Sequence, residues 1–386
     1  MAHLTKPVTY DIESSNIALL GSEIEKRVRR HAGDSESSWE DVGTRPGLRI
    51  WRIENFNVVD WPKDRYGSFY DGDSYIVLHT YKKDPKSEAL SYDLHFWLGA
   101  ETSQDEAGTA AYKTVELDDH LKGSPVQHRE VQGFESSRFL SYFPRCIILR
   151  GGVSTGFHHV SAPPPLNVKR LYQISATQST LATGKSTLVV REVRPKAASL
   201  VEGDVFVLDK GVEVWQLNTK ASIGKEKFKA AEFVQLVISD REGQCRVVVY
   251  DEGSSGAGIF LSEFGVEALT SRGMTDRSVK VPVTLYRVTD STGTVKFERV
   301  SPPTHSSFDS GDAFLLDNSA DVAHPAIFIW IGKDASLKER RLAMQYAQQH
   351  LYNKRGAGEL VHMGVSIIRM NEGSESEEFI NIINAQ

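Results

Sequence analysis

Six acidic residues recur at matching positions along the chain and could together hold metal ions. The Gly-Asp pairs are Gly72-Asp73, Gly203-Asp204 and Gly311-Asp312, and the matching glutamates are Glu106, Glu226 and Glu339. Each glutamate lies in the first turn of a predicted helix, near its core-facing side, where a carboxylate is unfavourable unless something compensates its charge. Glycine can offer its carbonyl, aspartate one oxygen and glutamate two, and Ca²⁺ prefers such oxygen ligands. The pattern therefore predicts one Ca²⁺ site in each copy.

A purely structural role is the main alternative for these acids. Glutamate is common in first turns, where it complements the helix dipole, and Gly-Asp is common where strands begin. Three copies in the same order, with no basic residue fixed beside the glutamates, favour a shared cation. Zinc is not expected because no Cys or His stands near these positions. An EF-hand is not expected either, because no D-x-D-x-D-G series occurs.

The elements that must position these acids recur as well. Each copy opens with a strand of aromatic and aliphatic residues, and the Gly-Asp pair then precedes an apolar strand. Next comes a strand with tryptophan, followed by the helix with glutamate. The last marker is a glycine before a short helix that begins with phenylalanine. Besides the acids, the markers are residues 48–53, 170–174 and 285–288, Trp97, Trp215 and Trp330, Gly133, Gly253 and Gly373, and Phe139, Phe260 and Phe379. Four ordered markers in three copies predict three homologous domains of roughly 110 residues.

Each domain is expected to be α+β, with a mixed central sheet between one long and one short helix. The long helices are amphipathic; in the second copy Ala230, Phe233, Val234 and Val237 share a face. The expected division is an N-terminal extension over 1–46, domain 1 over 47–160, domain 2 with its linker over 161–275 and domain 3 over 276–386. The extension is expected to be partly helical, over residues 12–31, with a polar and loosely held part over 34–47.

Composition excludes several classes of protein. The 386 residues are 40% hydrophobic and 25% charged, with a net charge of −6, which argues against nucleic-acid binding by bulk charge. No apolar run is long enough for a membrane span, and acidic residues interrupt any signal-peptide core. Cys146 and Cys245 are too few for a disulfide framework and are expected to be reduced thiols of a cytoplasmic protein.

Catalytic motifs are not found. Gly184-Lys185-Ser186 ends like a phosphate-binding loop, but Ser179 stands where that loop needs its first glycine. His158 and His159 are adjacent, so on a strand they would point to opposite sides and could not share a metal. The sequence also contains no HExxH or GxSxG motif. We therefore expect that the chain is not an enzyme.

Five segments of the first copy resemble the first domain of the gelsolin superfamily: residues 47–53, 66–75, 103–106, 126–135 and 151–157. Residues 107–119 and the three-domain length most closely resemble the severin and fragmin type. The resemblance runs from about Gly47 to the end and is most specific in the first copy. It implies a Ca²⁺-regulated protein that severs actin filaments, caps their barbed (fast-growing) ends and can nucleate new filaments.

The same resemblance implies ligands by motif position. Gly72, Asp73, Glu106 and the carbonyl of Val153 resemble the internal Ca²⁺ site of the first domain, while Asp118 with the carbonyls of Gly123 and Pro125 resembles a site completed by an actin carboxylate. Gly203, Asp204, Glu226 and Asp276 resemble the second domain's site, and Gly311, Asp312 and Glu339 the third domain's. In addition, Tyr112, Val115, Phe157, Lys169 and Arg170 are implied actin contacts.

Alternatives to this function remain at this point. The protein could cap barbed ends without severing, or it could be a Ca²⁺-dependent phosphoinositide-binding module that does not bind actin. The basic stretch after the first domain holds only Arg145, Arg150, Lys169 and Arg170, which predicts weak sensitivity to phosphoinositides. The free protein is expected to be a monomer associated with the cytoskeleton, with actin as monomer and filament for partners and Ca²⁺ as its cofactor.

Overall fold

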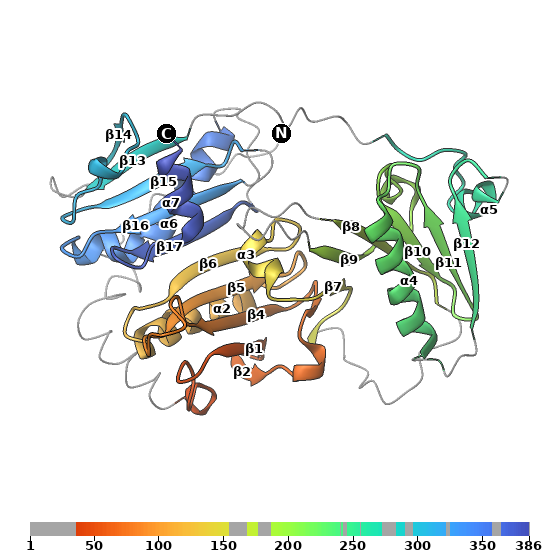
Figure 1. The fold of residues 1–386 in the computed structure, drawn as a ribbon, viewed down its shortest axis with the longest axis horizontal. Coiled ribbons are helices and arrows are strands. Elements are labelled where there is room, and N and C mark those ends of the chain that lie inside the picture. The colour runs from red at the N-terminus through yellow and green to blue at the C-terminus, as the bar shows by residue number, and fades with distance from the viewer. Residues whose placement is uncertain are drawn as a thin grey trace, which may run out of the picture.

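The computed structural model arranges the three copies around two mixed sheets (Figure 1). It describes residues 36–153, 168–176, 187–239, 241, 245–254, 256–271, 283–289, 296–321, 325–356 and 364–385. The ten-stranded sheet has the order β14-β13-β15-β16-β17-β6-β5-β4-β1-β2, and the seven-stranded sheet has the order β12-β11-β10-β8-β9-β7-β3. Among the described helices, none is long and apolar enough to cross a membrane.

The first copy contains β1 (Gly47–Glu54), β2 (Asn57–Asp60), β3 (Ser68–Tyr70), β4 (Ser74–Tyr81), β5 (Ser91–Leu98), α2 (Gln104–His120), β6 (Val126–Val131), α3 (Ser137–Ser141) and β7 (Cys146–Leu149). The second contains β8 (Arg170–Ala176), β9 (Leu188–Val193), β10 (Val205–Asp209), β11 (Glu213–Asn218), α4 (Gly224–Ser239), β12 (Arg246–Asp251) and α5 (Ala257–Ser262). The third contains β13 (Thr284–Thr289), β14 (Lys296–Val300), β15 (Ala313–Asn318), β16 (Ala326–Ile331), α6 (Leu337–Gly356), β17 (Ser366–Asn371) and α7 (Glu377–Asn384).

The long helix of each copy joins two parallel strands, so α2, α4 and α6 are crossovers in β5-α2-β6, β11-α4-β12 and β16-α6-β17 units. The other neighbouring strands within each copy are antiparallel, except β3 and β7, and this makes the sheets mixed. The central strands are buried on both faces. On β4, Ile76 and Leu78 pack toward α2, whereas Tyr75 and Val77 pack toward α3. The α+β fold with one long and one short helix per copy is thus confirmed.

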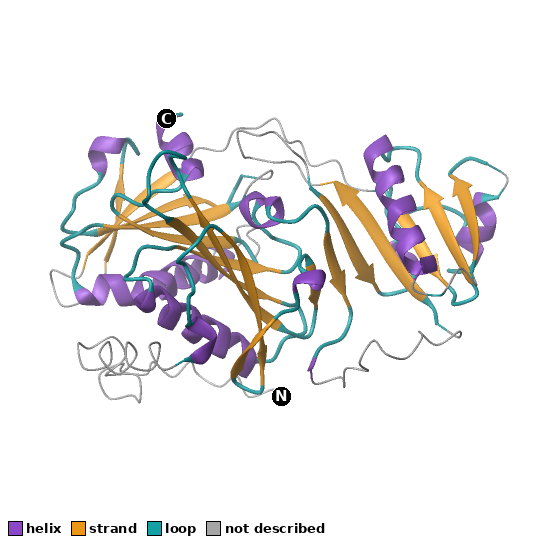
Figure 2. Cartoon of the chain, turned by 60° about the horizontal axis from the view of Figure 1, so that its bottom comes forward, coloured by secondary structure: helices purple, strands orange, loops and turns teal. Residues whose placement is uncertain are grey.

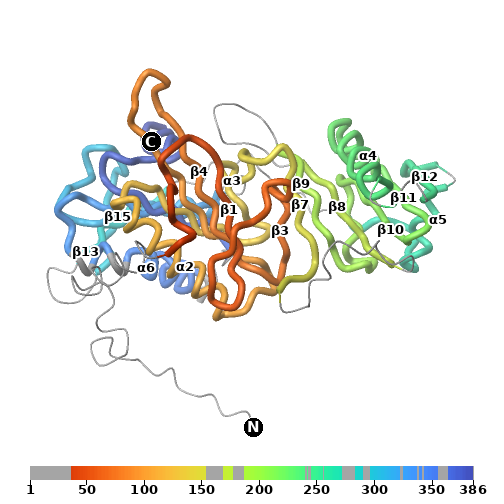
Figure 3. Tube along the Cα trace, turned by 90° about the horizontal axis from the view of Figure 1, so that it is seen from below, coloured from red at the N-terminus to blue at the C-terminus, as the bar shows by residue number. Residues whose placement is uncertain are grey.

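The copies also share strands. β17 of the third copy pairs antiparallel with β6 of the first, with Ile368 opposite His128, and this pairing joins five strands of each copy into one sheet. β7 of the first copy pairs with β9 of the second. The helices α2 and α6 lie side by side on one face of the ten-stranded sheet (Figure 2 and Figure 3). Met344 of α6 packs against the core clusters of both copies.

The segment before β1 is held more firmly than its polar composition predicts. Residues 37–39 form a short 3-10 helix, and the Trp39 side chain is almost fully buried. Its ring meets that of Trp51 edge to face at 5.1 Å, and its Nε1 donates to Glu116 Oε1 of α2 at 2.9 Å. Lys113 Nζ of the same helix donates to Glu36 Oε2 at 2.9 Å. Residues 36–46 are therefore not loosely held, because one large apolar ring anchors them to domain 1.

Candidate functional site

The first predicted Ca²⁺ position centres on Asp73, which is fully buried at the start of β4. Its Oδ1 accepts a hydrogen bond from the backbone N–H of Val153 at 2.8 Å, and its Oδ2 accepts one from the Tyr75 hydroxyl at 3.2 Å. Glycines surround the carboxylate: a Cβ on Gly152 would lie 2.4 Å from Asp73 Oδ1, and a Cβ on Gly72 would lie 2.6 Å from a backbone carbonyl oxygen. The loop at 151–153 can therefore close onto Asp73 only with these glycines.

The electrostatics at this position favour a cation. Burial raises the pKa of Asp73, and the nearby Glu106 carboxylate raises it further, against the opposing effects of the Val153 N–H and the Arg52 guanidinium. Glu106 lies in the first turn of α2, where its backbone N–H donates to the Ser103 hydroxyl of the N-cap, and its Oε2 accepts from Thr102 Oγ1 at 3.3 Å. Two neighbouring acids in a partly dry site repel each other, and a bound cation removes that repulsion. The donor set fits Ca²⁺ in its oxygen chemistry.

In the second position both acids contact β8. Gln173 on this strand donates to Asp204 Oδ2, and the backbone N–H of Ala176 donates to Glu226 Oε1 at 2.8 Å. Both acids are buried. Glu226 Oε2 also accepts the backbone N–H of Ile223 at 2.9 Å, just before α4 begins.

The third position repeats the cap at the start of α6. Glu339 Oε2 accepts the Ser336 backbone N–H at 2.9 Å, and the Glu339 N–H donates to the Ser336 hydroxyl at 3.1 Å. This reciprocal pair is a capping box. The purely structural role that the sequence left open for these glutamates, at the start of a helix, is therefore present in the second and third copies. One carboxylate oxygen suffices for a cap, so capping does not remove the Ca²⁺ ligand role.

Reasoning from the sequence missed the side chains that pair with the aspartates. Arg52 Nη1 lies 3.4 Å from Asp73 Oδ2, and Arg287 Nε donates to Asp312 Oδ2 at 2.7 Å. Arg52, Gln173 and Arg287 occupy the same position of the opening strand, which pairs with the strand that follows each Gly-Asp. Aligning the repeats around the opening strand could have revealed these partners.

The predicted actin contacts are only partly described. Tyr112 on α2 is 43% exposed and Val115 is half-buried. Lys169 is exposed and donates to the backbone carbonyl of Glu263 at 3.1 Å, and Arg170 is exposed at the start of β8. Phe157, like the predicted Ca²⁺ ligand Asp276, lies outside the described residues.

The residues predicted for the site shared with actin lie at or just beyond the C-terminal end of α2, and Asp118 and Gly123 contact the third copy. The backbone carbonyl of Gly123 accepts a hydrogen bond from Asn371 Nδ2 at 2.7 Å. Asp118 is buried, with its Oδ2 at 3.8 Å from Arg369 Nη1. Pro125 is buried immediately before β6. Gly123 has a φ of +68°, a conformation that favours glycine and lets the chain turn from helix to strand.

Comparison with known proteins gives three matches to one repeat. The family model "Gelsolin repeat" matches residues 55–140, 186–259 and 296–380. "Gelsolin-like protein 1" of Lumbricus terrestris is 41% identical over 333 residues, covering 86% of either chain. "Severin" of Echinococcus granulosus is 36% identical over 367 residues, covering 91% of this chain and 92% of the relative. "Actin depolymerising venom protein gelsolin 1" of Platymeris rhadamanthus is 38% identical over 312 residues, covering 78% of this chain and 79% of the relative.

Proposed function

Because the chain belongs to the gelsolin family and carries three gelsolin repeats, we propose that it is a Ca²⁺-regulated actin-binding protein that severs filaments and caps their barbed ends. One relative is named for actin depolymerisation and another is named severin, and both match this chain over most of their lengths. Proteins of this family are non-enzymatic actin regulators, in agreement with the expectation that the chain is not an enzyme.

The observation that carries the proposal is the contact between the first and third copies. β17 pairs with β6, and Asn371 and Arg369 at its end reach the C-terminal end of α2. This is the end of the helix at which actin would complete a shared site. In this proposal the structure is a closed state, in which the third copy takes contacts that actin would need. A regulated protein requires such a state.

Opening would follow from what the acidic residues do in each copy. Asp73 with Glu106, Asp204 with Glu226, and Asp312 with Glu339 would hold Ca²⁺, which supplies positive charge between each pair. Each pair links a helix to the sheet beneath it, so a shift of either acid moves the helix relative to the strands. Movement of α2 or α6 would strain the contact between the first and third copies, where β6 pairs with β17 and these two helices lie side by side. We call this contact the seam. Ca²⁺ binding and actin binding then share one coupled equilibrium.

The exposed face of α2 would form the actin contact once the seam opens. An amphipathic helix that lies in an apolar groove is a common recognition mode. Tyr112 is the described residue on α2 best placed for this, because 43% of its surface is exposed. We place the protein in the cytoplasm, where both free cysteines would stay reduced.

Imaging of single fluorescent actin filaments tests the function. At roughly 10 µM Ca²⁺ we expect filament breaks and arrested barbed-end growth, and with a chelator in place of Ca²⁺ we expect neither. Tyr112→Ala should weaken both effects, whereas Tyr352→Ala, at a tyrosine on α6 that is 65% exposed, should not. Intact, growing filaments at this Ca²⁺ concentration would refute the proposal. Arrested growth without breaks would restrict it to capping, and the absence of co-sedimentation with filaments would favour the phosphoinositide-binding alternative.

A further inference from the structure

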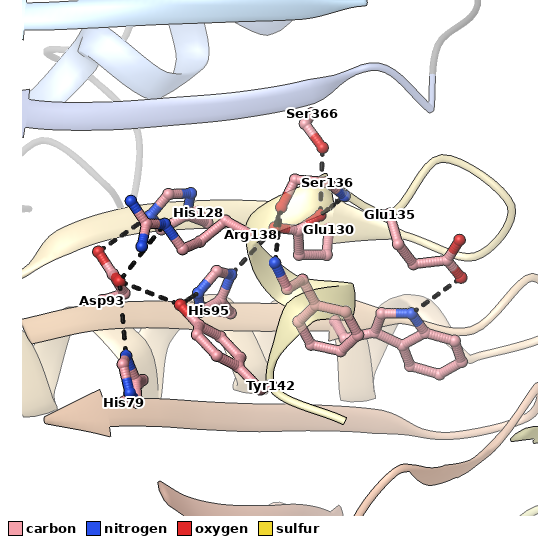
Figure 4. Close-up of polar contacts among 12 residues, drawn as sticks. His79, Asp93, His95, His128, Glu130, Glu135, Ser136, Arg138, Tyr142 and Ser366 are labelled. Atoms are coloured by element: carbon pink, nitrogen blue, oxygen red, sulfur yellow. Dashed lines mark hydrogen bonds and ion pairs between the residues drawn. The ribbon is translucent and has the colours of Figure 1, made fainter. Parts of the chain in front are cut away.

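A buried polar network lies between β5, β6 and α3, beneath the seam to the third copy (Figure 4). Its central side chain, His95, is fully buried. His95 Nδ1 lies 3.0 Å from Glu130 Oε1, and His95 Nε2 lies 2.9 Å from the Tyr142 hydroxyl oxygen. The Tyr142 hydroxyl in turn lies 3.0 Å from Asp93 Oδ2. Four side chains thus form one chain of three contacts, with a carboxylate at either end.

Donors around both carboxylates favour their ionised forms. Glu130 accepts hydrogen bonds from the Ser136 backbone N–H at 2.8 Å and from the Ser136 hydroxyl at 2.6 Å. The Ser366 hydroxyl of β17 lies 3.2 Å from Glu130 Oε2 and also 3.2 Å from the Phe134 carbonyl, and its one hydrogen serves one of the two acceptors. Asp93 has Arg138 Nε at 3.8 Å.

The number of hydrogens in this chain is one too few. Two ionised carboxylates supply none, a neutral tyrosine supplies one and a neutral imidazole supplies one. Two hydrogens cannot fill three contacts, so one contact would set lone pairs against each other. If Tyr142 donates to Asp93 and His95 Nε2 donates to Tyr142, the empty contact lies between His95 Nδ1 and Glu130 Oε1. A further cation between these two atoms would satisfy the whole network.

A second histidine, His128, lies beside this contact. His128 is only 1% exposed, and neither of its ring nitrogens has a hydrogen-bond partner in the described structure. Its nearest ion-pair partner, Asp93 Oδ1, is 3.7 Å from Nε2. One ligand atom each from His95, His128 and Glu130 lie within 4.8 Å of one another. A buried imidazole without a hydrogen bond is costly, and a metal ion would use its lone pair.

We propose that His95, His128 and Glu130 form a transition-metal site suited to Zn²⁺. Two imidazole nitrogens and one carboxylate oxygen are ligands that Zn²⁺ takes, whereas Ca²⁺ takes oxygen ligands. The site is therefore distinct in chemistry from the three acidic positions described above. Binding requires His128 to turn, because its ring stacks on that of His95 with centroids 4.2 Å apart. The turn gives up this stacking and the wide ion pair to Asp93, but no hydrogen bond of the His128 ring.

The surroundings supply the outer shell that such a site needs. A metal on His95 Nδ1 leaves Nε2–H to donate to the Tyr142 oxygen, and Tyr142 then donates to Asp93. Carboxylate-linked donors of this kind fix the tautomer and the orientation of metal-bound imidazoles. Any proton held on Nδ1 is released to solvent when the metal binds, so no other reactant is needed. Since Ser366 of β17 contacts Glu130, the site also lies against the seam between the first and third copies.

Metal titration of the full chain tests this proposal. The metal-free protein is held in excess Ca²⁺, so that the acidic positions are filled, and is titrated with Zn²⁺ alone against a chromophoric chelator. We expect one Zn²⁺ to bind and, with Co²⁺ instead, the visible absorption of a four-coordinate ion. His128→Asn should weaken this binding by at least about 100-fold and abolish the Co²⁺ absorption. His305→Asn, at an exposed histidine in the third copy, should change neither.

A second variant, Tyr142→Phe, tests the proposal even if His128→Asn fails to fold. Tyr142→Phe keeps all three ligands but breaks the chain to Asp93, so we expect Zn²⁺ affinity to fall about 10- to 100-fold with the Co²⁺ absorption retained. Equal Zn²⁺ affinity in the parent and in His128→Asn would overturn the proposal. So would a parent protein that binds no Zn²⁺. A nitrogen-15 NMR spectrum that then shows His95 protonated on both ring nitrogens would identify a proton as what fills the empty contact.

Discussion

Replacing Asn371 by alanine should make the protein respond to less Ca²⁺. Asn371 ends β17, and its side chain donates to the Gly123 carbonyl at 2.7 Å, beyond the last turn of α2. In the proposed regulation this hydrogen bond is present only in the closed state, because it joins the first copy to the third. Alanine removes the bond without adding bulk, and the Gly123 carbonyl in the closed state then has one donor fewer.

The size of the effect follows from the energy of one hydrogen bond. A partly buried, neutral hydrogen bond contributes about 1 kcal/mol, with a range of about 0.5–1.5 kcal/mol. At 25 °C this changes an equilibrium constant about fivefold. The ratio of closed to open protein should therefore fall about fivefold. If the open state binds Ca²⁺ more tightly, the Ca²⁺ concentration for half-maximal filament breakage falls by up to about the same factor.

Breakage counted on single filaments across a Ca²⁺ titration measures this midpoint. Asn57→Ala is a matched control, because Asn57 Nδ2 also donates to a backbone carbonyl, that of Asn55 at 3.0 Å, but within a single hairpin. Its midpoint should equal that of the parent protein. Arg369→Leu should act in the same direction as Asn371→Ala but less strongly, because the Arg369–Asp118 pair is wider at 3.8 Å.

An unchanged midpoint in Asn371→Ala, with normal folding, would refute the idea that this seam restrains the protein. A midpoint shifted toward higher Ca²⁺ would refute it more strongly, since it would mean that Asn371 supports the active state. If filaments break at the same rate in the parent protein with and without Ca²⁺, the error lies instead in the proposed regulation.

Three further predictions concern single domains. Asp204→Asn keeps an oxygen that can accept the hydrogen bond of Gln173, so it should lower the melting temperature only when Ca²⁺ is present. Equal stabilisation of variant and parent by Ca²⁺ would contradict the second Ca²⁺ site. Burial raises the pKa of Asp317, but donors that include His350 Nε2 at 2.7 Å outweigh it and hold this pKa well below the usual range. Asp317→Asn should therefore destabilise the protein by about 2 kcal/mol at pH 7. Urea unfolding should show this difference shrinking only below about pH 4, where the unfolded carboxylate takes up a proton first, and a constant difference down to pH 2 would contradict it. Trp39→Phe removes the donor to buried Glu116, which should cost about 1–2 kcal/mol and speed proteolysis near residue 36, whereas unchanged proteolysis would contradict an anchoring role.

The family, the fold of each copy and the helix that contains Tyr112 could be predicted from the sequence. The reason is that repeated local patterns carry this information. α2 is found at Gln104–His120 with Ser103 as its N-cap, so Glu106 lies in the first turn of a helix as expected. The three glutamates were expected near the core-facing sides of their helices; Glu226 and Glu339 are buried, and Glu106 is half-buried.

The loose segment expected over residues 34–47 shows where composition misleads. Its residues are mainly polar, yet Trp39 fits beside Trp51 and Glu116 in the domain 1 core. Average polarity cannot predict this, because a single large aromatic ring buries enough surface to hold a short segment in place. Its partners lie 12 and 77 positions away in the sequence.

The sequence by itself determined the three repeated units, the strands and helices of each, and the acids at matching positions in every unit. Those features follow from periodicity and spacing within about 110 residues. Only the tertiary structure decided that β6 pairs with β17, that Asn371 reaches Gly123, and that His95, His128 and Glu130 meet beneath that seam. The edge of a strand presents the same backbone donors and acceptors to any partner, so local sequence does not specify which strand will pair with it.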